Sequence, residues 1–238
     1  MDKEDTVIGN IKTVRPCWMQ YGMQKSNGMK KFKKVLAKQW SDYREDLVRL
    51  GEIQIPRWIQ LSPNEEVSLH GFCDGSDDAY SAVVYVRVSK EQKVVVTLMA
   101  AKTRVAPKKK KLTTPKIELC GAVLLASLMK KMKTTLNMEK VSTHLWSDSM
   151  ITLGCIAGNP GRWKPFVSNR VEQIQRNEFP STNWNYVNTS DNPADCASRG
   201  IMPNQLKNHP LWWEGPRWLK NDQSTWDRPT IPEHQLES

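Results

Sequence analysis

The sequence predicts a mixed α/β domain, and three observations support the prediction. Apolar residues alternate with polar ones in several short runs, they recur every three or four residues in other runs, and turn-forming residues separate the runs. The expected order is βββ-α-β-α-α-β-α. Strands are predicted at 67–73, 82–88, 94–99, 141–147 and 183–188, and helices at 114–132, 150–156 and 166–180, with a last helix after the fifth strand.

The clearest helix start is at Thr114, which the sequence predicts as the N-cap, with Pro115 in the first helical position. Ile117, Cys120 and Leu124 then fall on one face. Glu118 projects from the first turns of this helix, on the side of small residues.

Three further segments flank this domain, which spans residues 66–201. Residues 1–28 carry no clear pattern, and residues 29–65 contain a predicted helix from Met29 to Gly51 with an apolar face. Residues 202–238 are rich in Trp and Pro, with Leu211 to Leu219 as the most apolar part. We expect that part to pack on the domain surface, and a strip that binds a partner is the alternative.

The composition narrows the classes of function. The 238 residues include 35 Lys and Arg against 25 Asp and Glu, a net charge of +10, and residues 66–200 carry 19 basic and 12 acidic side chains. This excess favours a polyanionic partner, nucleic acid before a membrane surface. No run is long and apolar enough to span a membrane and the first residues do not read as a secretory signal, so an intracellular protein, cytoplasmic or nuclear, is expected. The five cysteines form no CxxC pair, and buried reduced thiols are expected.

Four acidic residues fall at the ends of predicted elements in this basic domain: Asp74, Glu118, Asp148 and Asp195. Carboxylates that gather repel one another and raise one another's pKa unless a cation neutralises them. Oxygen ligands suit Mg²⁺ or Mn²⁺, and a pair of such ions stabilises both oxygens of a phosphoryl displacement. Taken singly, each acid also has a local explanation, as a turn residue, a charge in a first helical turn or an N-cap.

The four acids and their neighbours resemble the RNase H domain of BEL/Pao-type long-terminal-repeat retrotransposon polyproteins. The matching text is Phe72-Cys73-Asp74-Gly75-Ser76, Thr114-Pro115-Lys116-Ile117-Glu118-Leu119, Leu145-Trp146-Ser147-Asp148-Ser149, and Asn192-Pro193-Ala194-Asp195 with Ser198-Arg199-Gly200. The flanks are similar too: residues 40–58 to the connection after reverse transcriptase, and Leu211 to Leu219 to the segment before integrase.

The resemblance implies a five-stranded mixed sheet flanked by helices, and cleavage of the RNA strand of RNA–DNA hybrids with two Mg²⁺ or Mn²⁺ ions. By position, Asp74 would ligate both ions, Glu118 and Asp148 would ligate one and orient the attacking water, and Asp195 would complete the second. The implied partners are the hybrid and the reverse transcriptase region of the parent polyprotein. Recognition through 2′-hydroxyls and hybrid shape implies little sequence specificity.

Hydroxyl and basic residues are the candidates for contact with the nucleic acid. Ser76 and Ser149 stand beside two of the acids, and the basic candidates are Arg162, Lys164, Arg170 and the run Lys108, Lys109, Lys110 and Lys111. A solvated loop without contacts is the alternative for the lysine run. Many RNases H carry a histidine before the last acid that helps product release. None lies between Asp148 and Asp195, so slower turnover is expected.

Two other functions compete with a ribonuclease. A catalytically inactive nucleic-acid-binding or scaffold remnant would keep the fold, although all four acids are present. An integrase or transposase core would place its last Glu near Asn183, where the nearest acid is Glu178, so it fits less well. An aspartic protease is not expected, because Asp74 is followed by Gly75 and not by a hydroxyl residue.

Overall fold

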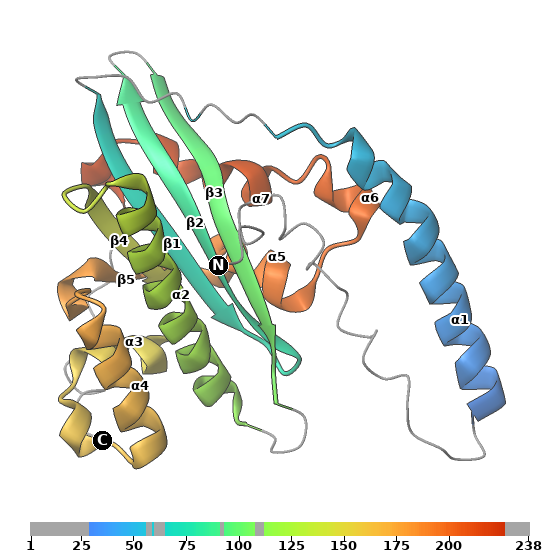
Figure 1. Ribbon diagram of the computed structural model, residues 1–238, viewed down its shortest axis with the longest axis horizontal. Helices are drawn as coiled ribbons and strands as arrows, with labels where there is room; N and C mark the ends of the chain where they lie inside the picture. Colours follow the sequence, from blue (N-terminus) through green and yellow to red (C-terminus); the bar gives the residue numbers. More distant parts are fainter. Residues whose placement is uncertain (1–28, 56–58, 60–64, 91–92, 108–111, 227–238) are drawn as a thin grey trace.

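The computed structural model describes residues 29–55, 59, 65–90, 93–107 and 112–226. A five-stranded sheet in the order β3-β2-β1-β4-β5 forms its centre (Figure 1). β1 (Glu66–Gly75), β2 (Ala79–Lys90) and β3 (Lys93–Val105) form an antiparallel meander, whereas β4 (Ser142–Ser147) and β5 (Trp184–Tyr186) run parallel to β1. The predicted mixed α/β class with a five-stranded mixed sheet is confirmed.

Strand lengths differ from the sequence pattern because pairing partners set them. β2 and β3 pair from Ala79 opposite Val105 to Lys90 opposite Lys93, so β3 runs well past its β-branched part. β5 is shorter than predicted, because it pairs with only three residues of β4, Leu145 to Ser147. The parallel pairing of β1 with β4 sets Cys73 beside Ser147, so both strands end at the same edge of the sheet.

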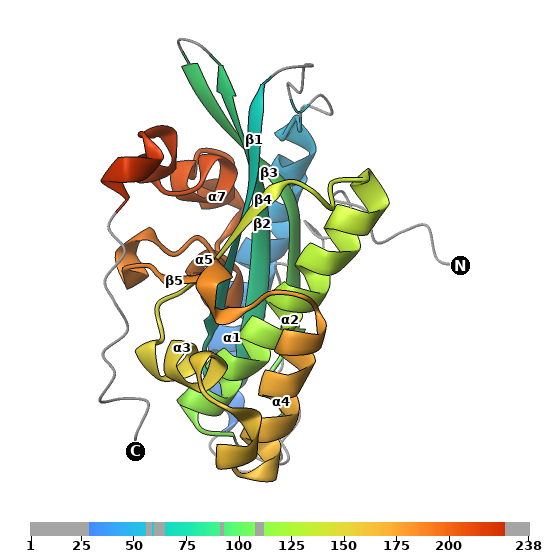
Figure 2. The same cartoon turned by 90° about the vertical axis from the view of Figure 1, so that its left-hand side faces the viewer.

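Helices cover one face of the sheet: α2 (Thr114–Leu136), α3 (Met150–Ala157) and α4 (Pro165–Arg176) (Figure 2). Leu125 and Met129 of α2 pack on Leu69 and Leu145 of the sheet in one buried cluster. The N-cap of α2 is Thr113, one residue before the predicted Thr114, and its carbonyl oxygen accepts hydrogen bonds from the N–H groups of Lys116 and Ile117 at 2.9 and 3.1 Å.

The C-terminal segment covers the opposite face, as Figure 2 shows for α7. It comprises α5 (Ala194–Arg199), α6 (Pro203–Leu206), α7 (Pro210–Glu214) and two 3-10 turns, Arg217–Lys220 and Gln223–Thr225. Buried aromatic side chains of the sheet, Phe72 and Trp146, pack there against Trp212 and Trp226, and the Trp146 and Trp218 ring centroids are 4.7 Å apart. The Trp-rich part therefore packs on the domain, the first of the two alternatives considered for it.

Polar side chains of β2 fix this segment in place. Arg87 is buried, and its Nε and Nη2 donate to the carbonyl oxygens of Leu219 and Asn221 at 2.9 and 3.2 Å. The Tyr85 hydroxyl donates to the carbonyl oxygen of Trp212 at 2.7 Å. A buried guanidinium needs such acceptors to offset its loss of water, so Arg87 ties the segment to the sheet through its backbone.

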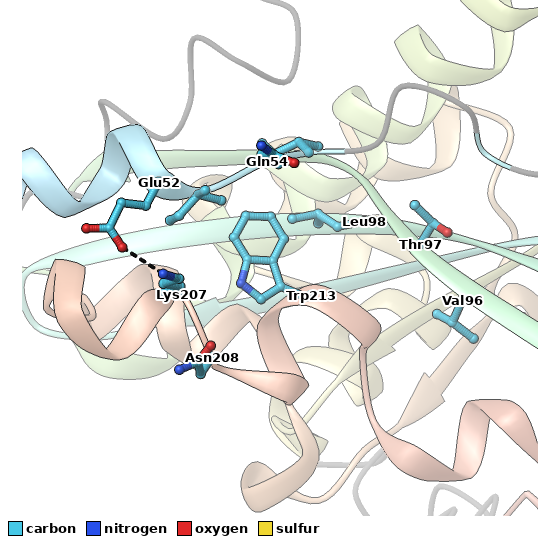
Figure 3. A pocket seen from close by; sticks show the side chains of 10 residues that line it. Glu52, Gln54, Val96, Thr97, Leu98, Lys207, Asn208 and Trp213 are labelled. Carbon is cyan, nitrogen blue, oxygen red and sulfur yellow. Dashed lines mark hydrogen bonds and ion pairs between the residues drawn. The ribbon is translucent and has the colours of Figure 1, made fainter.

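The N-terminal helix α1 (Met29–Asp46) runs along the side of the molecule, near α6 (Figure 1). The predicted helix to Gly51 continues beyond Asp46 as a 3-10 helix, Leu47–Glu52. A cavity of about 370 Å³ lies between the residues that follow, β3 and the C-terminal segment (Figure 3). The Trp213 indole stands within its lining, and the Lys207 ammonium pairs with Glu52 at 2.7 Å at its rim.

Two further findings concern the cysteines and the helices. Cys73 and Cys120 are buried and Cys155 and Cys196 half-buried, all as free thiols, whereas Cys17 lies outside the described residues. Among the helices that the structure describes, none has the length and apolar character needed to cross a membrane.

We predict that Arg87→Ala destabilises the protein by about 2–3 kcal/mol, because it removes a buried side chain and leaves the buried Leu219 carbonyl group and the partly buried Asn221 carbonyl group without this donor. Urea unfolding followed by Trp fluorescence measures the change. Arg104→Ala, at an exposed position of β3, is the control and should shift the unfolding free energy by less than about 0.5 kcal/mol. Equal shifts for the two variants would contradict the role given to Arg87.

Candidate active site

Asp74 and Glu118 approach each other because two glycines let β1 and α2 touch. A Cβ atom on Gly75 would lie 2.6 Å from the backbone nitrogen of Glu118, and one on Gly121 would lie 2.8 Å from the carbonyl oxygen of Asp74. Any side chain at either position would force the strand and the helix apart. The end of β1 therefore rests directly on the first turns of α2.

Asp148 follows β4 at the same edge of the sheet. The next residue, Ser149, is the N-cap of α3, and its hydroxyl accepts a hydrogen bond from the Thr152 N–H at 3.1 Å. The Asp148 carboxyl accepts hydrogen bonds from the side chains of Thr189 and Asn192. Asp148 thus lies between the end of β4 and the loop that leads to α5.

Hydrogen bonds from the sheet hold α5, which carries Asp195. The Asn192 amide donates to the Cys73 carbonyl oxygen at 3.0 Å, and the Ser81 hydroxyl donates to the Ala194 carbonyl oxygen at 2.7 Å. The Ser76 hydroxyl donates to the Ser198 carbonyl oxygen at 2.9 Å. These contacts, from the loop before α5 and from residues in or beside β1 and β2, set the position of a helix too short to hold itself.

The four acids act on one another electrostatically. Burial, and next the charges of Asp148 and Asp74, raise the pKa of Glu118, while a hydrogen bond from Ser149 lowers it. Burial and the charge of Asp74 raise the pKa of Asp148. Burial, then the charge of Asp74, raise the pKa of Asp195 to about 6, although Arg199 opposes the shift. The protein thus brings Asp74, Glu118, Asp148 and Asp195 into one region without neutralising them fully.

Two residues that belong to the last matching motif, but to which the sequence assigned no role, contact these carboxyls. The Ser198 hydroxyl donates to Asp74 Oδ2, and Arg199 Nε lies 2.6 Å from Asp195 Oδ1. Asp195 Oδ1 is buried and accepts no well-aligned hydrogen bond from any described residue. The sequence signals for Ser198 and Arg199 are their place in the matching motif and their position one helical turn after Asp195. Neither signal indicates the contact of Ser198 with Asp74, because these residues are 124 positions apart.

The chemistry of this set of carboxylates fits a hard divalent cation, since all four supply oxygen and their pKa shifts leave negative charge to be offset. Among the described residues, however, no three His, Cys, Asp or Glu side chains stand in an arrangement that encloses a metal ion. The Asp74 and Asp195 carboxyls instead contact Ser198 and Arg199 of α5.

The structure places the predicted nucleic-acid contacts as follows. The Ser76 and Ser149 hydroxyls take part in contacts within the protein. Arg162 and Lys164 are exposed just before and at the start of α4. Arg170 is half-buried, with its guanidinium 3.5 Å from the centre of the Phe166 ring. Contacts of these residues with a substrate stay predictions, and Lys108 to Lys111 lie outside the described residues.

Solved structures similar to this chain are RNases H. The N-terminal RNase H domain of a Mycobacterium tuberculosis protein is 18% identical, with a TM-score of 0.40, over 56% of this chain and 94% of that one. RNase H1 of Halobacterium salinarum is 13% identical, with a TM-score of 0.34, over 55% and 92%. LC11-RNase H1, solved in complex with an RNA/DNA hybrid, is 10% identical, with a TM-score of 0.36, over 59% and 99%.

Comparison with curated proteins finds no match. A family model described as "Pao retrotransposon-like RNaseH-like domain" matches residues 14–149. The matched region includes Asp74, Glu118 and Asp148, and Asp195 lies beyond it. The match covers more than half of the sequence and agrees with the mixed sheet described above, so the chain belongs to the Pao retrotransposon-like RNaseH-like domain family.

Proposed function

We propose that the chain is a ribonuclease H-type endonuclease domain that hydrolyses the RNA strand of RNA–DNA hybrids with two divalent metal ions, Mg²⁺ or Mn²⁺. One observation carries the proposal: besides burial, the charge of Asp74 raises the pKa of three carboxyl groups from other elements, Glu118, Asp148 and Asp195, near the edge where β1 and β4 end. Such a cost in electrostatic repulsion is typical of sites whose charge a ligand offsets.

In this proposal Asp74, Glu118, Asp148 and Asp195 hold the metal ions, with Asp74 between the other three. Bound divalent ions supply activation of a water molecule and stabilisation of charge on the phosphate oxygens. The protein's own groups set the geometry. Asn192 and Thr189 orient the Asp148 carboxyl by hydrogen bonds, and Ser149 does the same for Glu118. A carboxylate that is free of protons and close to the phosphate can also orient the attacking water.

The nucleic acid would lie across this edge of the sheet. Arg162 and Lys164 are exposed cations beside α4, and they would contact phosphates. The similar LC11-RNase H1 was solved with an RNA/DNA hybrid. Membership of a retrotransposon family supports the reverse transcriptase region of a parent polyprotein as a second partner.

We expect Asp148→Asn to lower the rate of hybrid cleavage by about 100-fold or more, because it removes a charged oxygen ligand. The assay follows a hybrid labelled on its RNA strand, with Mg²⁺ and with EDTA. Glu172→Gln is the matched control, since Glu172 is a partly exposed acid of α4 paired with Arg176, and it should keep wild-type activity. Hybrid binding by a wild-type protein that does not cleave would favour the inactive remnant.

We also expect Asp148→Asn to stabilise the fold in EDTA, in a manner that depends on pH. The folded protein raises the pKa of Asp148 above its ordinary value of about 3.9. Between the pKa of the unfolded state and the raised pKa of the folded state, the folded state therefore binds more protons than the unfolded state. Wild-type stability therefore falls, relative to the variant, as pH rises through this window, and the difference is constant above it. Thermal unfolding from pH 4 to pH 8 measures the difference.

The same experiment in Mg²⁺ supplies the control. A cation bound to the folded state should raise the wild-type melting temperature at pH 7.5 and raise that of Asp148→Asn less. A variant that is no more stable than wild type at pH 7.5 in EDTA would show that the carboxyl repulsion described here is absent.

A further inference from the structure

The helix α5 has little freedom to move, which confines the Asp195 carboxyl. Its backbone carbonyl groups at Ala194 and Ser198 accept hydrogen bonds from the Ser81 and Ser76 hydroxyls at 2.7 and 2.9 Å. The Thr103 hydroxyl donates to the Ala197 carbonyl oxygen at 3.4 Å. With the backbone held by the sheet, the carboxyl group of Asp195 stays beside that of Asp74. The charge of Asp195 must therefore be offset by groups that lie close to this position.

One turn of α5 supplies the groups that offset the charges of Asp74 and Asp195. The Ser198 hydroxyl donates a hydrogen bond to the Asp74 carboxyl. Arg199, four residues after Asp195, forms an ion pair with the Asp195 carboxyl at 2.6 Å. The carboxyl side chain is 25% exposed, but the arginine side chain is 63% exposed. The cation of this pair is therefore mostly exposed, whereas the Asp195 oxygen that it contacts is buried.

We propose that Arg199 is an internal counter-ion that competes with a divalent cation for the Asp195 carboxylate and thereby sets the affinity of the site for metal. The inference rests on the proposed function, since it concerns the same carboxylates. It assigns to Arg199 a positioning role through Asp195, and no contact with the reacting atoms.

Competition follows from geometry and charge. The Arg199 Nε atom lies against Asp195 Oδ1, an oxygen that a cation at this carboxyl would use, and its positive charge would repel a divalent ion nearby. The ion pair is also easy to break. Because water screens the mostly exposed Arg199 side chain, the pair should contribute about as much as an exposed ion pair, a factor of about 1.4 to 5 in an equilibrium constant. Arg199 can therefore stabilise the metal-free protein without excluding metal.

Calorimetric titration with Mn²⁺, compared among variants, tests the proposal without an activity measurement. Arg199→Gln should bind Mn²⁺ about two- to fivefold more tightly than wild type, because the competing charge is gone. Arg199→Lys keeps the charge and should stay within about twofold of wild type. Arg176→Gln is the matched control, since Arg176 forms the same i,i+4 kind of pair with Glu172, at 3.1 Å on α4, and its affinity for Mn²⁺ should be unchanged.

A second measurement observes the contact directly in the wild-type protein. The Arg199 Nε–H resonance, identified by its absence from the spectrum of Arg199→Lys, should shift as Mg²⁺ is added and the ion pair opens. The Arg176 resonance should not shift. A merely structural role for Arg199 predicts that Arg199→Gln is less stable but binds Mn²⁺ no more tightly.

The outcomes separate this inference from the proposed function. The competition is overturned if Arg199→Gln binds Mn²⁺ no more tightly than wild type, while Asp195→Asn loses Mn²⁺ binding and the wild-type protein cleaves the hybrid. In that case the proposed nuclease function is still supported. No Mn²⁺ binding by either wild type or Arg199→Gln, together with no cleavage, overturns both.

Discussion

The parallel pairing of β1 with β4 is the constraint on which the rest of the site depends. Because the strands run in the same direction and end together, Asp74 and Asp148 emerge side by side at one edge of the sheet. Glu118 and Asp195 join them only because two glycines allow α2 to touch β1 and hydrogen bonds tie α5 to the sheet. Repulsion among the carboxyls opposes this arrangement, and the surrounding packing maintains it.

The two faces of the sheet share this task. On one face, α2 and its apolar neighbours form a core that places Glu118. On the other face, the aromatic side chains of the sheet pack against α5 and the segment after it. Asp195 therefore depends on a layer in which nearly all the covering residues come from the end of the chain.

Patterns local in the sequence predicted most of the fold and indicated the four acids as candidate site residues. Alternating residues indicated β1, turn residues marked the end of that strand, and Pro115 marked the start of α2 within one residue. The resemblance to a known family linked the acids, which spacing alone does not do. Contacts between distant residues were beyond this reasoning. The hydrogen bond from Ser81 to Ala194 joins residues 113 positions apart, and no pattern in the sequence around either residue indicates it. For the same reason the sequence did not reveal that the Ser76 and Ser149 hydroxyls form hydrogen bonds within the protein, and their contacts with a substrate stay predictions.

The packing of the Trp-rich segment determines where the chain can be truncated without exposing its core. A fragment that stopped at Gly200 would keep every strand and all four acids, yet it would leave Phe72 and Trp146 uncovered and Arg87 without its acceptors. Such a face of aromatic side chains in water favours aggregation. The smallest unit that folds cleanly thus extends at least to Trp226, some thirty residues past the last of the four acids.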